Sequence, residues 1–318
     1  MNCQTNLVVI VPFFNESTSL PYLLSQLEVQ TVVPERVLLV DSSSTDESVS
    51  VIEAWKKSAT SRSGYELLQA NTHTPGGSKT AGVLASHESF IAFMDCGLTF
   101  PATWLETQVS KLASGDADWI SGVNVNYGIN LWDRAAIAHT LGLGRARPAI
   151  PSSVIKRELF EKIGYFKDFR AGYDVEWSKR AKRAGASRII NPDVVIQYHA
   201  VNFADTWINI FFKSYTYAKP SVLCDSNGAP SIYIVALFTA GPLFVFVSDA
   251  RLYLALAYVI GRLLVATTKS RWEIRYFFKS LSRLLVLVLV GLIIDAGKTL
   301  GFLAGFRLKV FRQRLLLI

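Results

Sequence analysis

Four short apolar segments in the first hundred residues most strongly constrain the fold of this chain. They read NLVVIVPFF, RVLLVD, YELLQA and FIAFMD. Short β-branched or aromatic runs bounded by polar and turn-forming residues are typical of buried strands. Between the first two, leucines recur at helical spacing over residues 20–27. Because strands that alternate with helices form parallel layers, the pattern predicts an α/β fold with a largely parallel, doubly wound sheet.

Acidic residues follow three of these strands. Glu16, Asp41 and Asp95 each lie at or just past a predicted strand end, where ligands bind in sheets of this kind. The first turn reads PFFNES, which differs from the GxGxxG of dinucleotide-binding domains, and the chain has no P-loop lysine motif. The common phosphate-cradling folds are therefore disfavoured, and the acidic strand ends need another explanation.

The region from residue 115 to 220 is less regular. DADWISGVNV predicts a strand, SSVIKRELFEKIG a strand that runs into a helix, and YDVEWSKRAKRAG a helix that ends at Gly185. DVVIQYH predicts a last strand that ends at His199. FADTWINIFFKSYTYAK predicts an amphipathic helix that lies on a membrane or packs on the sheet.

Five blocks of the sequence resemble, in order, those of family 2 glycosyltransferases. VVIVPFFNES is similar to the first strand and its P-x-x-N-E turn, and VLLVDSSSTDES to the second strand with its V-D-x-x-S-T-D pattern. GGSKTAGVLAS resembles the glycine-rich turn, with Lys79 and Thr80 where Arg-Asn is usual. FIAFMDCGLTFPATWLE and AGYDVEWSKRAKRAG resemble the next two blocks. Together the blocks span residues 7–199, about three-fifths of the chain.

The resemblance implies a GT-A fold, which is Rossmann-like with a mostly parallel sheet flanked by helices, followed here by apolar C-terminal helices. It implies an inverting glycosyltransferase of the hexosyl- or deoxyhexosyl-transferring class. Such an enzyme moves a sugar from a nucleotide-sugar donor to an acceptor. The apolar C-terminal segment suggests that this acceptor is a lipid-linked or surface glycan in polysaccharide biosynthesis. Mg²⁺ or Mn²⁺ would bridge the donor phosphates.

The resemblance also implies roles for individual residues. Asp174 would be the general base that takes the proton of the acceptor hydroxyl. Lys79 would approach the donor phosphates, Asp95 would contact the ribose or the metal, and His199 would contact the metal or a phosphate. The residues that would line the nucleoside pocket are Pro12, Phe14, Glu16 and Asp41.

Gly97 departs from the family pattern, because D-x-D is common where this chain reads Asp95-Cys96-Gly97. A glycine allows a ligand to approach the backbone closely. Since Mg²⁺ keeps several waters and binds substrate phosphates, one carboxylate can suffice to hold it. We therefore expect an active, metal-assisted enzyme.

Each residue also has a structural interpretation. Asp41 can simply end a strand, Asp46 can cap a helix, and Glu16 lies in a first helical turn, where acids are favoured. His199 alone would more often be structural. The alternative function is a non-catalytic nucleotide-sugar-binding scaffold in a glycan assembly complex.

The C-terminal third predicts membrane association. The chain carries a net charge of +8. A nucleic-acid-binding protein would have its basic residues interleaved with aromatic residues on a soluble face. Here the basic residues border apolar runs, which favours anionic lipid headgroups over nucleic acid as the partner. We expect a catalytic domain over residues 1–220 on the cytoplasmic side of the inner or plasma membrane. A membrane-associated region over 221–318 would contain a hairpin of two spans (about 232–268), a basic amphipathic segment (269–283) and an interfacial or re-entrant apolar segment (284–306).

The three cysteines, Cys3, Cys96 and Cys224, are widely spaced and form no CxxC pair. Neither a disulfide framework nor a zinc site follows from this spacing, which fits a reducing compartment.

Overall fold

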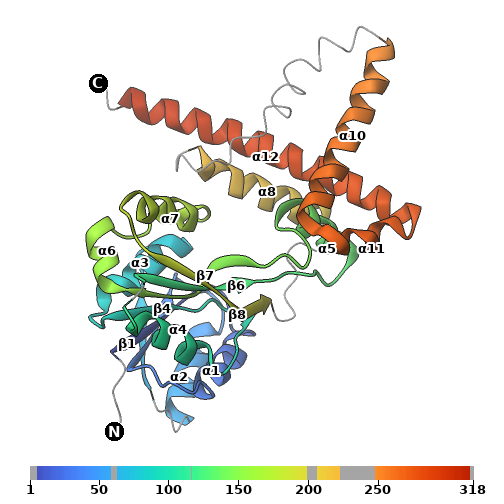
Figure 1. Ribbon diagram of the computed structural model, residues 1–318. Coiled ribbons are helices and arrows are strands. Elements are labelled where there is room, and N and C mark those ends of the chain that lie inside the picture. Colours follow the sequence, from blue (N-terminus) through green and yellow to red (C-terminus); the bar gives the residue numbers. More distant parts are fainter. Residues whose placement is uncertain (1–5, 59–62, 116, 199–205, 223–247, 316–318) are drawn as a thin grey trace. The chain divides into compact units, whose positions relative to one another are not determined.

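The structure is a computed structural model that describes residues 6–58, 63–115, 117–198, 206–222 and 248–315. Its residues form two compact units (Figure 1). The first unit comprises residues 1–125 and 146–200, and the second comprises residues 126–145 and 201–318. The predicted division of function at residue 220 stays a prediction. The packing groups residues 126–145 and 201–220 with the C-terminal helices.

The described part of the first unit contains an eight-stranded sheet with the strand order β3-β2-β1-β4-β7-β6-β8-β5. Strands β1 to β4 pair in parallel, as do β6 and β8, whereas β7 runs antiparallel to both of its neighbours. The predicted α/β class is thus confirmed, with a mixed sheet. The strands are β1 (Leu7–Phe13), β2 (Arg36–Asp41), β3 (Gly64–Gln69), β4 (Phe90–Phe93), β5 (Leu98–Thr99), β6 (Trp119–Asn124), β7 (Arg147–Lys156) and β8 (Arg188–Tyr198).

Helices cover both faces of this sheet, which explains why the central strands are apolar throughout (Figure 1). In β1, Leu7, Val9 and Val11 pack in one core, while Val8 and Ile10 pack in the other. The first core includes α1 (Leu20–Glu28), α2 (Ser48–Ser58) and α4 (Trp104–Ala113), and the second includes α3 (Pro75–Ala85), α6 (Arg157–Ile163) and α7 (Tyr173–Arg183).

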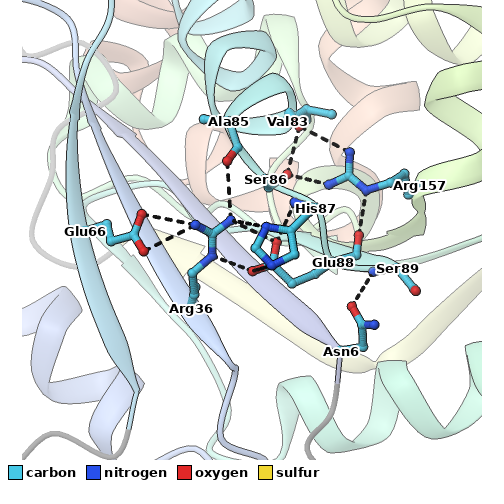
Figure 2. A network of polar contacts seen from close by, with 10 residues as sticks. All are labelled: Asn6, Arg36, Glu66, Val83, Ala85, Ser86, His87, Glu88, Ser89 and Arg157. Atoms are coloured by element: carbon cyan, nitrogen blue, oxygen red, sulfur yellow. Dashed lines mark hydrogen bonds and ion pairs between the residues drawn. The ribbon is translucent and has the colours of Figure 1, made fainter.

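A polar network lies at the amino end of β2 (Figure 2). Arg36, the first residue of β2, donates from Nε to Oε1 of the fully buried Glu88 at 2.5 Å and forms a second ion pair with Glu66 at 3.1 Å. Arg157 donates to the Glu88 backbone carbonyl at 2.7 Å. Burial is the largest single effect and raises the pKa of Glu88. The hydrogen bond from Arg36, the backbone N–H hydrogen bonds and the charge of Arg36 together outweigh burial, so the pKa is lowered overall. This network joins the strand ends that lie opposite the acidic ones.

The second unit is helical in the residues described. Its helices are α5 (Leu131–Thr140), α8 (Trp207–Ser221), α10 (Ser248–Ser270), the 3₁₀ turn η1 (Arg271–Ile274), α11 (Arg275–Phe278) and α12 (Leu281–Leu315). Helices α8 and α12 lie side by side (Figure 1). Three glycines of α12 permit this: a Cβ on Gly297, Gly301 or Gly305 would approach an α8 carbonyl oxygen to 2.2–2.6 Å.

The described residues test the predicted membrane segments only in part, and the two-span hairpin stays a prediction. Residues 232–247, the first arm of the predicted hairpin, lie outside the described residues, and the second arm is part of α10. In the described chain, the helix that is long and apolar enough to cross a membrane is Leu281–Leu308, with a mean hydropathy of 2.0. The candidate span is therefore the segment expected to be interfacial, because α12 continues unbroken through Asp295 and Lys298.

Candidate active site

The loops after β1 and β2 are joined by side-chain hydrogen bonds at the carboxyl edge of the sheet. The Asn15 N–H donates to Ser44 Oγ at 3.0 Å, and the Thr45 N–H donates to Asn15 Oδ1 at 2.8 Å. Asn15 has a φ of 54°, a conformation that asparagine tolerates better than most residues. The N-E pair of the first turn is thus held against the loop that follows Asp41.

Asp46 connects the same two loops. Its carboxylate accepts from the Ser48 hydroxyl at 2.5 Å and from the Ser17 N–H at 3.1 Å. The hydrogen bond from Ser48 is the main reason that the pKa of Asp46 falls to about 2. The helix-capping interpretation of Asp46 therefore understates its role, since it also orders the turn that contains Glu16.

Asp41 ends β2 and is buried. Its Oδ1 accepts from the Ser44 N–H at 2.9 Å, and the Gln69 side-chain amide, in its hydrogen-bonding orientation, donates to Oδ2 at 3.0 Å. Close by, Pro12 pairs in register with Val40, and Phe14 exposes 47% of its surface. The predicted nucleoside-pocket residues therefore combine a fixed carboxylate, at the end of β2, with an open aromatic ring just after the end of the adjacent β1.

The glycine-rich turn opens α3. Thr74 caps this helix by accepting from the Gly77 N–H at 3.1 Å. A Cβ on Gly76 would lie 2.3 Å from the Lys167 carbonyl oxygen, and one on Gly77 would lie 2.4 Å from Asp168 Oδ1. Because no side chain fits at either position, the two glycines bring α3 against the loop before α7.

Lys79 on α3 and Asp95 after β4 form an ion pair. The Lys79 Nζ lies 2.5 Å from Asp95 Oδ1. The Lys79 side chain is fully buried, whereas the Asp95 side chain exposes 30% of its surface. The Lys79 Nζ also lies 5.6 Å from the centroid of the Tyr173 ring. The structure thus brings two predicted phosphate-site residues into direct contact.

Glu16 contributes a second carboxylate near this pair. Burial raises its pKa most, the Ser19 hydroxyl bound to its Oε2 opposes this, and the charges of Asp95 and Asp46 raise the pKa further. Burial, together with the charges of Glu16 and Asp95, also raises the pKa of the Cys96 thiol. The site is therefore acidic and partly desolvated, and it favours a cation or a hydrogen-bond donor.

Gly97 has a φ of 73°, in the left-handed region. The turn that it makes leads into β5, and Gln26 fixes this strand by donating to the Leu98 carbonyl at 2.9 Å and accepting from the Phe100 N–H at 2.7 Å. Glycine adopts such a φ at no steric cost. The position at which D-x-D motifs carry a second carboxylate is therefore occupied here by Gly97, whose backbone conformation suits glycine.

Asp174 lies in the first turn of α7, after Gly172 with a φ of 78°. Its neighbour Glu176 is buried and pairs with Arg180 at 2.8 Å and Lys167 at 3.1 Å. Burial raises the pKa of Glu176, but the hydrogen bonds from Arg180 and Lys167 lower it more, so Glu176 stays ionised. Glu176 thus anchors α7, and the half-buried Asp174 is the acid in this turn that is available to a ligand.

A divalent metal is implied by the family resemblance, and the nearby donors can be tested against it. In the described chain, no group of three or more His, Cys, Asp and Glu side chains could hold a metal. His199 lies outside the described residues. Asp95 accepts its described hydrogen bond, from Lys79, on Oδ1. Glu16 lies near enough that the negative charge of Asp95 raises the pKa of Glu16. One or two carboxylates that leave positions for phosphates and waters fit Mg²⁺ or Mn²⁺.

Two residues of this region were not predicted from the sequence. Asp168 accepts from the hydroxyls of Thr72, at 2.6 Å, and Thr74. Tyr173 lies against Gly76 and beneath Lys79. Asp168 lies in the loop that enters α7, and Tyr173 is the first residue of this helix. Their signal in the sequence was only their position shortly before Asp174.

Residues 8–181 match the pattern of the family described as "Glycosyl transferase family 2". The chain is 24% identical over 200 residues to the glycosyltransferase AglE of Haloferax volcanii; the match covers 59% of this chain and 64% of that relative's length. The fold is similar to that of the mannosyltransferase PcManGT of Pyrobaculum calidifontis, solved in complex with GDP-Man and Mn²⁺. That likeness has a TM-score of 0.58 and 19% identity, and covers 92% of this chain and 88% of the other.

Proposed function

This chain belongs to glycosyl transferase family 2, and we propose that it is a membrane-associated, inverting glycosyltransferase. It moves a sugar from a nucleotide-sugar donor to a lipid-linked or surface-glycan acceptor. The observation that carries the proposal is the convergence of Glu16, Lys79 and Asp95 at the carboxyl edge of a GT-A sheet, where ligands bind in such folds.

The donor nucleoside lies against the ends of β1 and β2. Phe14 offers an exposed ring for a base or ribose, and Asp41 offers a carboxylate held at one orientation by the Ser44 N–H. Pro12 shapes the same edge, because it is half-buried beside Val40. These contacts orient the donor before any chemistry takes place.

The diphosphate lies near Lys79 and Asp95. The Lys79 ammonium is a compact charge on a flexible four-carbon stem, which would let it turn from Asp95 towards a phosphate oxygen of the donor. Asp95, with Glu16 beside it and His199 as a further donor, would hold Mg²⁺ or Mn²⁺. When bound, this metal neutralises charge that develops on the leaving diphosphate.

Asp174 is the general base. It accepts the proton of the acceptor hydroxyl while that oxygen attacks the anomeric carbon. The bond from the anomeric carbon to the diphosphate oxygen breaks with its electron pair, and the nucleoside diphosphate leaves. A single displacement inverts the configuration at the carbon. Glu176 and Arg180 hold α7 in place, so that Asp174 keeps its position.

The acceptor is presented at a membrane. The candidate span Leu281–Leu308 and the basic residues that precede it support this part of the proposal. We propose that the catalytic unit faces the cytoplasm, because the Lys and Arg residues of the segment 269–283, beside the candidate span, favour the anionic cytoplasmic leaflet.

A non-catalytic donor-binding scaffold is the second candidate. The Lys79–Asp95 ion pair favours it, since the carboxylate that would hold a metal already has a cationic partner. The two candidates differ in turnover rather than in donor binding.

The test is release of nucleoside diphosphate from UDP-, GDP- and dTDP-sugars by the full-length protein in detergent, with membrane lipid extract as acceptor and Mn²⁺ or Mg²⁺ present. The enzyme should release one nucleoside diphosphate per sugar transferred. Donor binding without any release would support the scaffold.

A further inference from the structure

The second unit contains a pocket of about 610 Å³ that the catalytic proposal does not use. It lies over the segment η1–α11, which connects α10 to α12. The residues that line it come from this segment and from α5: Arg134, Trp272, Glu273, Arg275, Tyr276, Phe278 and Lys279. Its lining therefore joins three cations, one acid and three aromatic rings.

The cations of this pocket are unneutralised. Arg134, Arg275 and Lys279 form no salt bridge within the residues that the structure describes, although Glu273 lines the same pocket. Three positive charges against one negative charge leave a net charge of about +2 at the mouth of a hollow. Guanidinium groups that have no carboxylate partner are ready to bind phosphate oxygens.

Aromatic rings hold two of the guanidinium groups in place. The Arg134 guanidinium lies 4.6 Å from the Tyr276 ring centroid, and that of Arg275 lies 4.9 Å from the Trp272 centroid. Arg283 stacks on Tyr276 as well, at 4.3 Å. Such stacking leaves the N–H edges of a guanidinium free to donate while restricting its motion.

The chain makes a sharp turn to build this pocket. Arg271, the first residue of η1, has a φ of 50°, which is costly for a residue with a long side chain. Gly144 permits Glu273 to approach, because a Cβ there would lie 3.1 Å from Glu273 Cγ. The turn at Arg271 thus brings η1 against the segment after α5, with Glu273 beside Gly144.

The surroundings of the pocket suit a lipid rather than a free ion. Trp272 exposes 75% of its surface, and Phe278 and Leu281 are also exposed. Beyond them, α12 exposes Leu285, Leu289 and Leu292 at helical spacing. Tryptophan and basic residues that border an apolar helix are typical of the membrane–water interface.

We propose that this pocket binds the phosphate group of a membrane lipid, with the lipid chains along the exposed leucines of α12. Arg134, Arg275 and Lys279 bind the phosphate oxygens, and Trp272 and Phe278 lie at the level of the headgroups. The inference rests on the proposed membrane association and not on sugar transfer.

The experiment titrates the full-length protein, in maltoside detergent, with dihexanoyl phosphatidic acid by calorimetry. Dihexanoyl phosphatidylcholine and inorganic phosphate are the comparison ligands. Phosphatidic acid should bind saturably and at least about tenfold more tightly than either comparison ligand. Equal affinity for inorganic phosphate would overturn the assignment to a lipid, and absence of binding by folded protein would overturn the site.

The variant Arg275→Gln/Lys279→Gln localises the binding. Both side chains are exposed, so the fold should persist. The affinity for phosphatidic acid should fall roughly 25-fold, since each cation near a membrane surface contributes about fivefold. The control Lys57→Gln/Lys162→Gln changes the net charge equally at exposed sites of the first unit and should bind as the wild type does. Equal losses in both variants would show a nonspecific charge effect and overturn the site.

Two further readouts separate the possible failures. The fluorescence of Trp272 is obtained as the emission of the wild type minus that of Trp272→Phe. This difference spectrum should shift when phosphatidic acid binds, and a difference spectrum that is the same with and without the lipid would contradict the location. Nucleotide-sugar binding is measured on the same samples. Loss of lipid binding with donor binding intact therefore concerns this pocket alone, whereas loss of donor binding concerns the proposed function.

Discussion

The Lys79 ammonium lies 2.5 Å from Asp95, and the two sides of this ion pair differ in burial. The lysine is fully buried, while the carboxylate exposes 30% of its surface. Removing one partner of a buried pair leaves the other charge uncompensated, and the cost depends on how well water reaches the remaining charge. The loss of stability should therefore depend on which of the two residues is replaced.

Asp95→Asn should destabilise the protein more than Lys79→Met. The asparagine variant leaves a buried ammonium without its carboxylate, which should cost about 2–3 kcal/mol. The methionine variant leaves a carboxylate that water can reach, and the cost should be about 1 kcal/mol or less. Thermal unfolding of the two variants measures the difference. Equal or reversed costs would mean that Lys79 is better solvated than its burial indicates.

Asp174→Asn should reduce sugar transfer by roughly 10²–10⁴-fold and leave donor affinity unchanged, because only the proton-accepting group is lost. Glu176→Gln is the matched control in the same helical turn. It should lower the melting temperature, because it removes an anchor of α7, and should reduce transfer much less. If Asp174→Asn instead abolished donor binding, the residue would be structural.

Glu16→Gln should raise the melting temperature at pH 7. Burial, the largest cause, raises the pKa of Glu16 above its ordinary value. The folded state therefore holds this proton more tightly than the unfolded state, and stability falls as the pH rises from 4.5 through the folded pKa. The gain in the variant should vanish below pH 4, where both states are protonated. A melting temperature that is lower in the variant at pH 7 would contradict this.

Arg36→Met should cost about 3 kcal/mol of stability at pH 7, because Glu88 has no exposed surface and loses its partner. The pKa of Glu88 is lowered in the folded protein, so the stabilisation is complete above pH 4.5 and is lost as the pH falls through the folded pKa. The difference between variant and wild type should therefore shrink in acid. Chemical unfolding at pH 7 and pH 3.5 tests this, and a difference that does not depend on pH would refute it.

The strands were predictable because burial on both faces makes each of them a continuous apolar run, as in β1. The antiparallel β7 was not, since the run SSVIK is equally compatible with either direction. The segment over 284–306 was expected to be interfacial or re-entrant because basic clusters flank it on both sides. In the described residues it forms part of the candidate span Leu281–Leu308, and the hairpin stays a prediction. In the structure Asp295 pairs with Arg262 of α10 at 3.2 Å, and α12 continues.

In the candidate site, too, some features could be predicted from the sequence, whereas others depend on tertiary packing. Asp41, Asp95 and Asp174 were assigned their roles from the resemblance of the surrounding blocks to the family, and these roles stay predictions. The contact between Lys79 and Asp95 could not be predicted, because it depends on how α3 packs beside the end of β4. The close approach of Gly76 and Gly77 to the loop before Tyr173 likewise depends on tertiary packing.

The most direct measurement is binding of UDP-, GDP- and dTDP-sugars to the full-length protein in detergent, each with Mn²⁺, Mg²⁺ or chelator, and repeated with Asp95→Asn. The account predicts that one nucleotide class binds tightly, that chelator weakens this binding, and that Asp95→Asn weakens it as well. Folded protein that binds no donor under any of these conditions, or a variant that binds as tightly as the wild type, would contradict a donor site at the Lys79–Asp95 pair.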